Sequence, residues 1–194
     1  MTDINTMLSR VRACQICKDL LPHGIRPVVQ ASKKSKILIA GQAPGSKVHA
    51  SGVPFDDASG NRLRDWMGVS SAIFYDPAKV AILPMGFCYP GTGKSGDMPP
   101  RAECAPAWRR SLLDFMPDIE LTLVIGTYAA KWHLGEHQKK SLTETVRCWR
   151  NYVDEGVLPL PHPSPRNNIW LKKNPWFEAE VLPVVKLKVR ALLT

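Results

Sequence analysis

The segment from Lys36 to Gly45, KILIAGQAPG, constrains the fold of this chain more than any other stretch. Its apolar run, Ile37 to Ala40, is typical of a short strand buried on both faces of an α/β sheet. The turn that follows combines glycines, which permit a tight bend, with Pro44, which fixes φ and removes a donor. Open α/β sheets bind ligands at such turns. An ordinary strand-to-loop turn is the alternative; we expect ligand contacts at Gly41, Gln42, Ala43, Pro44 and Gly45.

Strands and helices alternate along the rest of the chain. Further strands are expected at 79–83, 119–125 and 157–160. Helices are expected at 3–18, 60–67, 102–115, 127–134, 143–151 and 176–193, with Ser59 capping the second and Pro183 kinking the last. Loops are expected at 46–59 and 89–100. Alternation implies parallel strands and right-handed crossovers. The sequence, without repeats or linkers, predicts a single domain over 1–194: a three-layer α/β/α sandwich with a central four-stranded parallel sheet.

The charge balance narrows the class of partner. The chain has 26 Lys and Arg against 17 Asp and Glu, a net charge of +9. Such an excess suits a polyanion such as DNA, because phosphate contacts release counterions, although solvated surfaces can also be basic. No apolar run is long enough to span a bilayer, and the first twelve residues lack the apolar core of a secretion signal.

The cysteines form a second pattern. Cys14 and Cys17 make a C-x-x-C pair, and Cys88 and Cys104 flank the Gly- and Pro-rich stretch downstream. Without a secretion signal, reduced thiols or metal ligands are expected rather than disulfides. Four thiolates brought together would suit an iron–sulfur cluster or zinc. The alternative is that they are buried core thiols, as we expect for Cys148.

A further motif, LPLPHPSPRNN, runs from Leu158 to Asn168. A strand-end G-Q-x-P turn with a late HPSP resembles the two signature motifs of the uracil-DNA glycosylase superfamily. The resemblance runs from Cys14 to about Leu193. Its closest branch is the bacterial iron–sulfur type called family 4, with features of family 5. The resemblance implies a [4Fe-4S] cluster on Cys14, Cys17, Cys88 and Cys104, with zinc as the alternative.

The resemblance also implies a function. The chain is expected to be a DNA N-glycosylase of base excision repair, a hydrolase that flips uracil or a related deaminated base out of DNA and cleaves its N-glycosidic bond. The sugar becomes cationic and the base leaves as an anion, so both charges need stabilising. Single- or double-stranded DNA is the expected partner of a monomeric, cytoplasmic protein.

The catalytic residues are assigned by the same resemblance. In family 5 the carboxylate that activates water lies three residues before the Gly of a Ser-Gly pair, where this chain has Asp57. Family 4 has a Glu where this chain has Gln42, and family 1 has an Asp at Ala43; neither residue here can be a general base. Gln42 is still expected among the catalytic residues, because its neutral amide can hold a water molecule. His162 resembles the superfamily histidine that donates to uracil O2. The alternative is that Asp56 or Asp57 merely caps the next helix.

The remaining site residues follow from the same comparison. Phe55 takes the place of the aromatic residue that stacks on the flipped base. The amide of Ser164 is expected to contact phosphate, and Arg166 occupies the place of an apolar wedge in family 1. Asn167 is expected to contact the DNA backbone or base edges.

One departure concerns base reading. The asparagine that reads uracil in family 4 lies four residues before the third cysteine, where this chain has Pro84. Proline has no side-chain donor or acceptor, so we expect contacts from the backbone of Met85 and Gly86 instead. A non-catalytic binder of damaged or single-stranded DNA is therefore the second reading.

A small-molecule nucleoside hydrolase is disfavoured by the positive charge and the HPSP motif. An ATPase is excluded because Gly93-Lys94-Ser95 lacks the first glycine of a P-loop.

Overall fold

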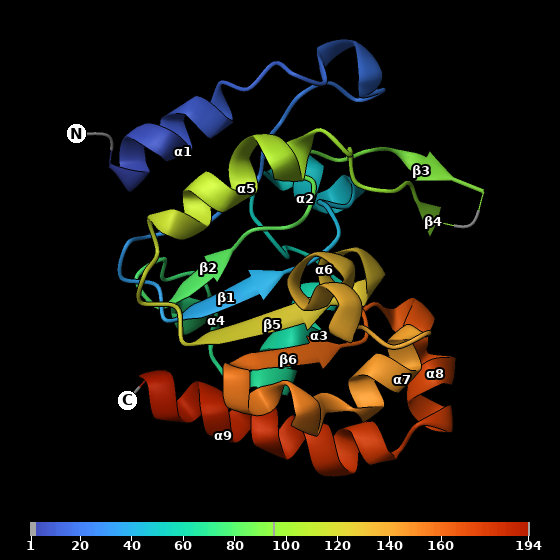
Figure 1. Ribbon diagram of the computed structural model, residues 1–194. Coiled ribbons are helices and arrows are strands. Elements are labelled where there is room, and N and C mark those ends of the chain that lie inside the picture. The colour runs from blue at the N-terminus through green and yellow to red at the C-terminus, as the bar shows by residue number, and fades with distance from the viewer. Residues whose placement is uncertain (1–2, 95, 194) are drawn as a thin grey trace.

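Four parallel strands form the middle layer of the protein. The computed structural model describes residues 3–94 and 96–193. The strand order is β2-β1-β5-β6, from β1 (Ile37–Ala40), β2 (Val80–Ile82), β5 (Leu121–Ile125) and β6 (Val157–Leu160). Helices cover both faces (Figure 1). The predicted three-layer α/β/α sandwich is confirmed.

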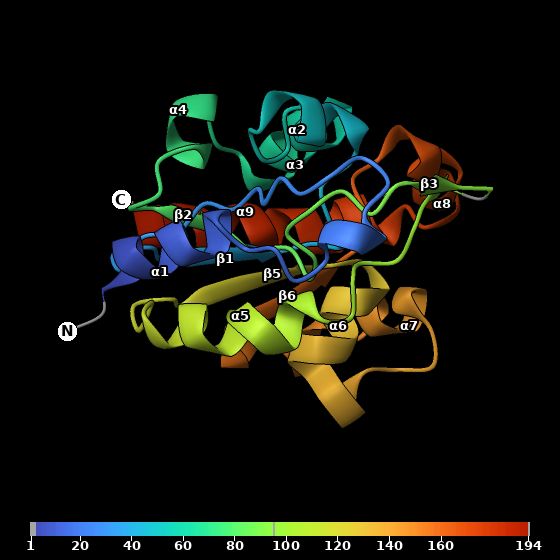
Figure 2. The ribbon, with the colours of Figure 1, turned by 90° about the horizontal axis from the view of Figure 1, so that it is seen from above.

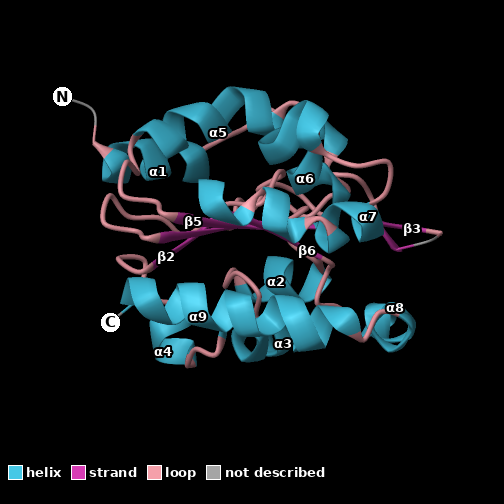
Figure 3. Ribbon diagram, turned by 60° about the horizontal axis from the view of Figure 1, so that its bottom comes forward, coloured by secondary structure: helices cyan, strands magenta, loops and turns pink. Residues whose placement is uncertain are grey.

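The helices divide between the two faces of the sheet (Figures 2 and 3). One face carries α1 (Ile4–Arg12), α5 (Cys104–Asp114), α6 (Gly126–Leu134) and α7 (Leu142–Arg147). The other carries α2 (Ser46–Ser51), α3 (Ala58–Met67), α4 (Ser71–Phe74), α8 (Asn168–Lys173) and α9 (Leu182–Leu193). Short 3₁₀ helices occupy Lys18–Leu20, Gly135–His137, Trp149–Asn151, Val153–Glu155 and Pro165–Asn167.

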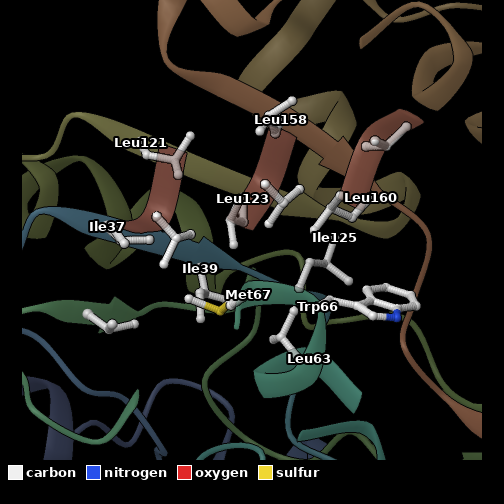
Figure 4. Close-up of a cluster of buried hydrophobic side chains, with 14 of the residues drawn as sticks. Ile37, Ile39, Leu63, Trp66, Met67, Leu121, Leu123, Ile125, Leu158 and Leu160 are labelled. Atoms are coloured by element: carbon white, nitrogen blue, oxygen red, sulfur yellow. The ribbon is translucent and has the colours of Figure 1, made fainter. Parts of the chain in front are cut away.

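Alternation along β1 explains why both faces are covered. Ile37 and Ile39 pack with Leu63 and Met67 of α3 in one core, shown in Figure 4, whereas Leu38 packs into a second core with residues of α1 and α5. All four residues of β1 are buried, as the apolar run predicts. A strand buried on both faces holds the turn after it on a rigid base.

Several boundaries differ from the predictions. The first helix ends at Arg12, because the chain turns away before the C-x-x-C pair. Asp57 rather than Ser59 caps α3, and α2 lies inside the predicted 46–59 loop. The predicted 89–100 loop contains a two-stranded hairpin, β3 (Thr92–Gly93) with β4 (Gly96–Asp97). A π-helical turn, Phe177–Val181, precedes α9, which contains Pro183 in its first turn.

The topology places the functional edge of the sheet. The chain leaves β1 toward β2 but leaves β5 toward β6, so the general rule for such sheets predicts ligand binding at the carboxyl ends of these central strands. The hairpin reaches out on this side, whereas α1 begins and α9 ends on the opposite side, where the strands start (Figures 1 and 2). Within the described residues, no helix has the length and apolar character to cross a membrane.

Candidate active site

A cleft of about 470 Å³ opens at the carboxyl ends of β1, β2 and β6. It is lined by the turn at 41–45, Phe55, Asp57, His162, Ser164, Arg166 and Asn167. These residues come from segments more than one hundred positions apart in the sequence. Every predicted catalytic and substrate-binding residue except Met85 therefore lies on one cleft.

The turn after β1 is held from two sides. The amides of Met85 and Gly86 donate to the carbonyls of Gly41 and Gln42 at 2.8 and 2.9 Å. The side-chain Nε2 of Gln42 donates to the carbonyl of Met98, just beyond the hairpin, at 3.0 Å. Gln42 thus joins the turn to the hairpin segment, and its amide is already engaged.

Phe55 is fixed in an unusual backbone conformation. Its φ is +54°, the only positive value among the described non-glycine residues. A Cβ on Gly60 would lie 1.8 Å from the Phe55 carbonyl oxygen, so only glycine permits this close approach. The ring packs edge-to-face on Phe74 with centroids 6.1 Å apart, and Phe55 Cζ lies 3.7 Å from where a Gly41 Cβ would be. A preformed aromatic wall therefore stands beside the turn.

Asp57 has two roles in the geometry. It is the N-cap of α3, and its Oδ1 accepts a hydrogen bond from the Gly60 amide at 2.9 Å. The cap that the alternative reading expects is therefore present at Asp57. The residue also lines the cleft, whereas the exposed Asp56 does not. A cap uses one carboxylate oxygen, so capping and a role in the cleft are compatible.

His162 lies two residues after the last residue of β6 and is partly buried. Burial lowers its pKa below the usual 6.5, partly offset by the negative charges of Asp57 and Asp97. The Ser164 amide donates to Nδ1 at 3.2 Å, so Nδ1 is unprotonated. In the neutral ring the proton then sits on Nε2, which is a hydrogen-bond donor. Asn167 Nδ2 donates to the His162 carbonyl at 2.7 Å and fixes the loop.

Asp97 is a second carboxylate of the cleft that sequence reasoning missed. It stands in β4 of the hairpin, and its charge is felt by His162. Its Oδ1 accepts from Thr92 Oγ1 at 3.2 Å, and its Oδ2 lies 3.4 Å from where a Cβ on Gly45 would be. Only the hairpin folding back over the turn brings it here. The available signal was an acidic residue in a Gly-rich stretch between two candidate metal ligands.

Cations stand at the rim. Lys47 and Arg166 line the cleft, and Nη1 of Arg166 lies 3.0 Å from the position of a Cβ on Gly96 of the hairpin. Arg62 of α3 braces the loop after β6 by donating to the Ser164 carbonyl at 3.1 Å and to Asn168 Oδ1 at 2.8 Å. The HPSP loop is therefore held in place next to positive charge.

Met85 lies outside the cleft lining. Its side chain is buried in a core cluster with Ala40 and Val124, and its amide is spent on the Gly41 carbonyl. Pro84, which precedes it, does line the cleft. The amides of Met85 and Gly86 are therefore not free for the predicted backbone contacts, which leaves their carbonyls for that role.

The four candidate cysteine ligands line one apolar pocket. Cys14, Cys17, Cys88 and Cys104 meet there beside Val11, Phe87 and Trp108, whereas Cys148 lies elsewhere. Trp108 Nε1 donates to the Cys14 sulfur and the Phe87 amide to the Cys104 sulfur, both at 3.3 Å. Burial raises the pKa of Cys88 to about 11 and that of Cys104 to about 12, so as free thiols both carry protons that a metal would have to displace.

No three His, Cys, Asp or Glu side chains of the described residues are arranged to hold a single metal ion. Ligands of one zinc ion converge within about 2.3 Å of a common centre. Cys14, Cys17, Cys88 and Cys104 share one pocket, which keeps both an iron–sulfur cluster and zinc as candidates.

The family comparison agrees with this geometry. A model of the uracil DNA glycosylase superfamily matches residues 28–186, which include the turn after β1, Phe55, Asp57 and the loop after β6. Cys14 and Cys17 precede the matched range. The match spans most of the chain, and the chain belongs to the uracil DNA glycosylase superfamily.

Proposed function

We propose that the protein is a DNA glycosylase that flips uracil, or a related deaminated base, out of DNA and hydrolyses its N-glycosidic bond in base excision repair. The observation that carries the proposal is the meeting of Phe55, Asp57 and a neutral His162 on one cleft. This set offers a stacking surface, a negative charge and a hydrogen-bond donor. Those are the groups that departure of a base from a deoxyribose requires.

The flipped base stacks on Phe55, whose ring is already fixed beside the turn. As the N-glycosidic bond breaks, its electron pair goes to the base, and Nε2–H of His162 donates to the oxygen where negative charge grows. A neutral imidazole serves here because it donates a hydrogen bond without first needing a proton from solvent.

The sugar cation is balanced by carboxylates. Asp57 is the proposed residue that positions a water molecule, which adds to the anomeric carbon and gives up a proton to the carboxylate. Gln42 is ranked below it, because its amide cannot accept that proton and already donates to Met98. Asp97 faces the same cleft and adds negative charge against the cationic sugar.

Binding to DNA is proposed to rest on phosphate contacts. The net charge of +9, the cations at the rim and the Ser164 segment support this role. Arg166 stands on the loop next to the cleft, where it can reach the backbone that flanks a flipped nucleotide.

The cysteine pocket is proposed to hold a [4Fe-4S] cluster through Cys14, Cys17, Cys88 and Cys104. Hydrogen bonds to two of the sulfurs and an apolar wall fit such a group. The cluster would brace the 89–100 segment structurally; base excision is hydrolytic and needs no electron transfer. The four cysteines support placement of the chain near family 4, whereas the position of Asp57 resembles family 5. The protein is further proposed to act as a monomer in the cytoplasm.

The decisive experiment incubates the purified protein with oligonucleotides that carry one uracil, hypoxanthine or xanthine, followed by alkaline cleavage of abasic sites. Strand cleavage that depends on the protein and on the modified base is expected.

A second function, non-catalytic binding of damaged DNA, is favoured by Pro84, which cannot read a base edge. Tight binding to these oligonucleotides without any abasic product would establish that second function instead.

A further inference from the structure

A fully buried arginine lies beneath the cleft and has no part in the steps above. Arg109 of α5 is 0% exposed. Its Nη1 donates to the carbonyls of Leu83 and Pro84 at 2.6 and 3.1 Å, and its Nη2 pairs with His133 Nε2 of α6 at 2.7 Å. Its Nε has no hydrogen-bond partner among the described residues, and no carboxylate of theirs forms an ion pair with it.

The pair carries one positive charge. Burial lowers the pKa of Arg109 to about 10, which leaves it a cation at neutral pH. Burial and the charge of Arg109 lower the pKa of His133 to about 3, so the imidazole is neutral and Nε2 accepts the hydrogen bond. A buried cation is costly to fold, since burying a charge removes its hydration. The negative charge of a deprotonated Cys104 acts on Arg109 in the opposite direction and favours the cation.

The position of this charge is informative. Leu83 and Pro84 continue the chain directly from β2, and Pro84 lines the cleft. The Pro84 carbonyl turns toward Arg109, which is not part of the cleft lining. The amides of Met85 and Gly86 are spent on the turn at 41–42. On this side of the cleft, therefore, the lining residue is Pro84, and the cation of Arg109 lies behind it. No side chain that could read a base edge stands at this position.

Taking the proposed glycosylase function as its basis, we infer that Arg109 is a positioning residue for departure of the base. It holds the Leu83–Pro84 carbonyls away from the cleft and supplies a buried positive charge on the side where the base becomes an anion. A fixed charge in a poorly hydrated site stabilises such an anion more strongly than it would in water. Because a charge reads no donor and acceptor pattern, this device favours any base that leaves as an anion.

The test compares leaving groups of different acidity. Single-turnover rates are measured on matched oligonucleotides that carry uracil or 5-fluorouracil, whose fluorine stabilises the departing anion. Arg109→Gln should slow uracil release by about tenfold to a hundredfold and 5-fluorouracil release clearly less. Affinity for the uracil oligonucleotide should change little, because the charge acts mainly in the transition state. The matched control is Arg110→Gln, the exposed neighbour on the same helix.

Each outcome decides the point. A loss that is equal on both bases, in a variant with a wild-type circular dichroism spectrum and melting temperature, would mean that Arg109 only braces the fold and would overturn the inference. If Arg109→Gln does not fold, Arg109→Lys is measured instead, because it retains the cation. The ratio of the uracil and 5-fluorouracil release rates should then equal the wild-type ratio, and a changed ratio contradicts the charge role. A wild-type protein that releases neither base removes the proposed function, and this inference with it.

Discussion

At the scale of single residues, Asp57 and Asp56 are adjacent carboxylates with different surroundings. Asp57 caps α3 and lines the cleft, whereas Asp56 is exposed. Asp57→Asn should lower turnover on the order of 10²–10³-fold, because the amide cannot take a proton from water. Stability should hardly change, since Asn is as good an N-cap as Asp. Single-turnover kinetics and thermal melting test both halves, with Asp56→Asn as the control. An Asp56→Asn variant that is inactive beside an active Asp57→Asn would reverse the assignment.

His162 allows a prediction about charge coupling. Its pKa is lowered by burial and raised in part by Asp57 and Asp97. Removing one negative charge should therefore lower the pKa of His162 further, so Asp97→Asn should shift its titration to more acidic pH. The imidazole signal followed by NMR across the acid range measures this shift. An unchanged titration midpoint would mean that Asp97 does not face the histidine in solution.

Residues were predictable where a motif ties them to a strand end. Gln42 and His162 lie two residues beyond the ends of β1 and β6, so the sheet alone places them at one edge. Asp97 was not predictable in this way, because its position depends on a hairpin closed by backbone pairing between Thr92 and Asp97. Arg109 was hidden for another reason: an arginine in an amphipathic helix reads as solvated, and only the packing of α5 and α6 buries it.

At the scale of elements, the strands were predicted to within two residues, because apolar runs between glycines and prolines mark them clearly. The short elements around the site were not predicted, since helices and hairpins of a few residues carry little periodic signal in the sequence. The helix α2 has six residues, and β3 and β4 have two each. These elements form through contacts with the turn and with each other rather than through local propensity.

The start of α3 is predicted to tolerate no side chain at Gly60. Gly60→Ala would place a methyl group 1.8 Å from the Phe55 carbonyl oxygen, so the helix start or Phe55 must move. We expect a destabilisation of roughly 2–4 kcal/mol, measured by urea unfolding. Gly41→Ala is the matched comparison, since its new methyl group would lie at an ordinary 3.7 Å from the Phe55 ring. Equal stability of the two variants would contradict this packing.

The segment between Cys88 and Cys104 is predicted to depend on the cysteine pocket. Cys14→Ser should abolish the brown colour and the iron and labile sulfide of protein purified without air, and should lower the melting temperature. Cys148→Ser is the control, because Cys148 does not line the pocket. If the wild-type protein is colourless under these conditions and elemental analysis finds stoichiometric zinc, the pocket binds zinc and the cluster assignment is wrong.

At the scale of the whole molecule, the charge excess predicts a steep salt dependence. Log affinity for DNA should fall linearly with log salt concentration, because binding releases counterions from phosphates. Arg166→Ala should reduce the slope by about 1 if its guanidinium contacts one phosphate. Lys186→Ala provides the comparison, since Lys186 lies on α9, where its side chain packs near Gly68. Fluorescence anisotropy over a salt series gives both slopes, and a flat series contradicts the phosphate model.

Stability at acid pH should depend on the pair formed by the buried Arg109 and the partly buried His133. His133 has an ordinary pKa of 6.5 when unfolded and about 3 when folded. Between these values the unfolded chain binds an extra proton, so stability should fall as pH drops from about 6.5 toward 3, by on the order of 2–4 kcal/mol. Urea midpoints at several pH values measure the slope. His133→Gln should flatten it, whereas substitution of the exposed His137 by Gln should not.

The placement of the two chain ends has a practical consequence. Because α1 begins and α9 ends at the edge of the sheet where the strands start, a protein joined at either end would lie at the edge opposite the cleft. A fluorescent reporter or a targeting module could therefore be attached there by a flexible linker without obstructing the approach of a nucleic acid. The same arrangement would leave the cleft free if the protein were immobilised on a sensor surface through a terminal tag.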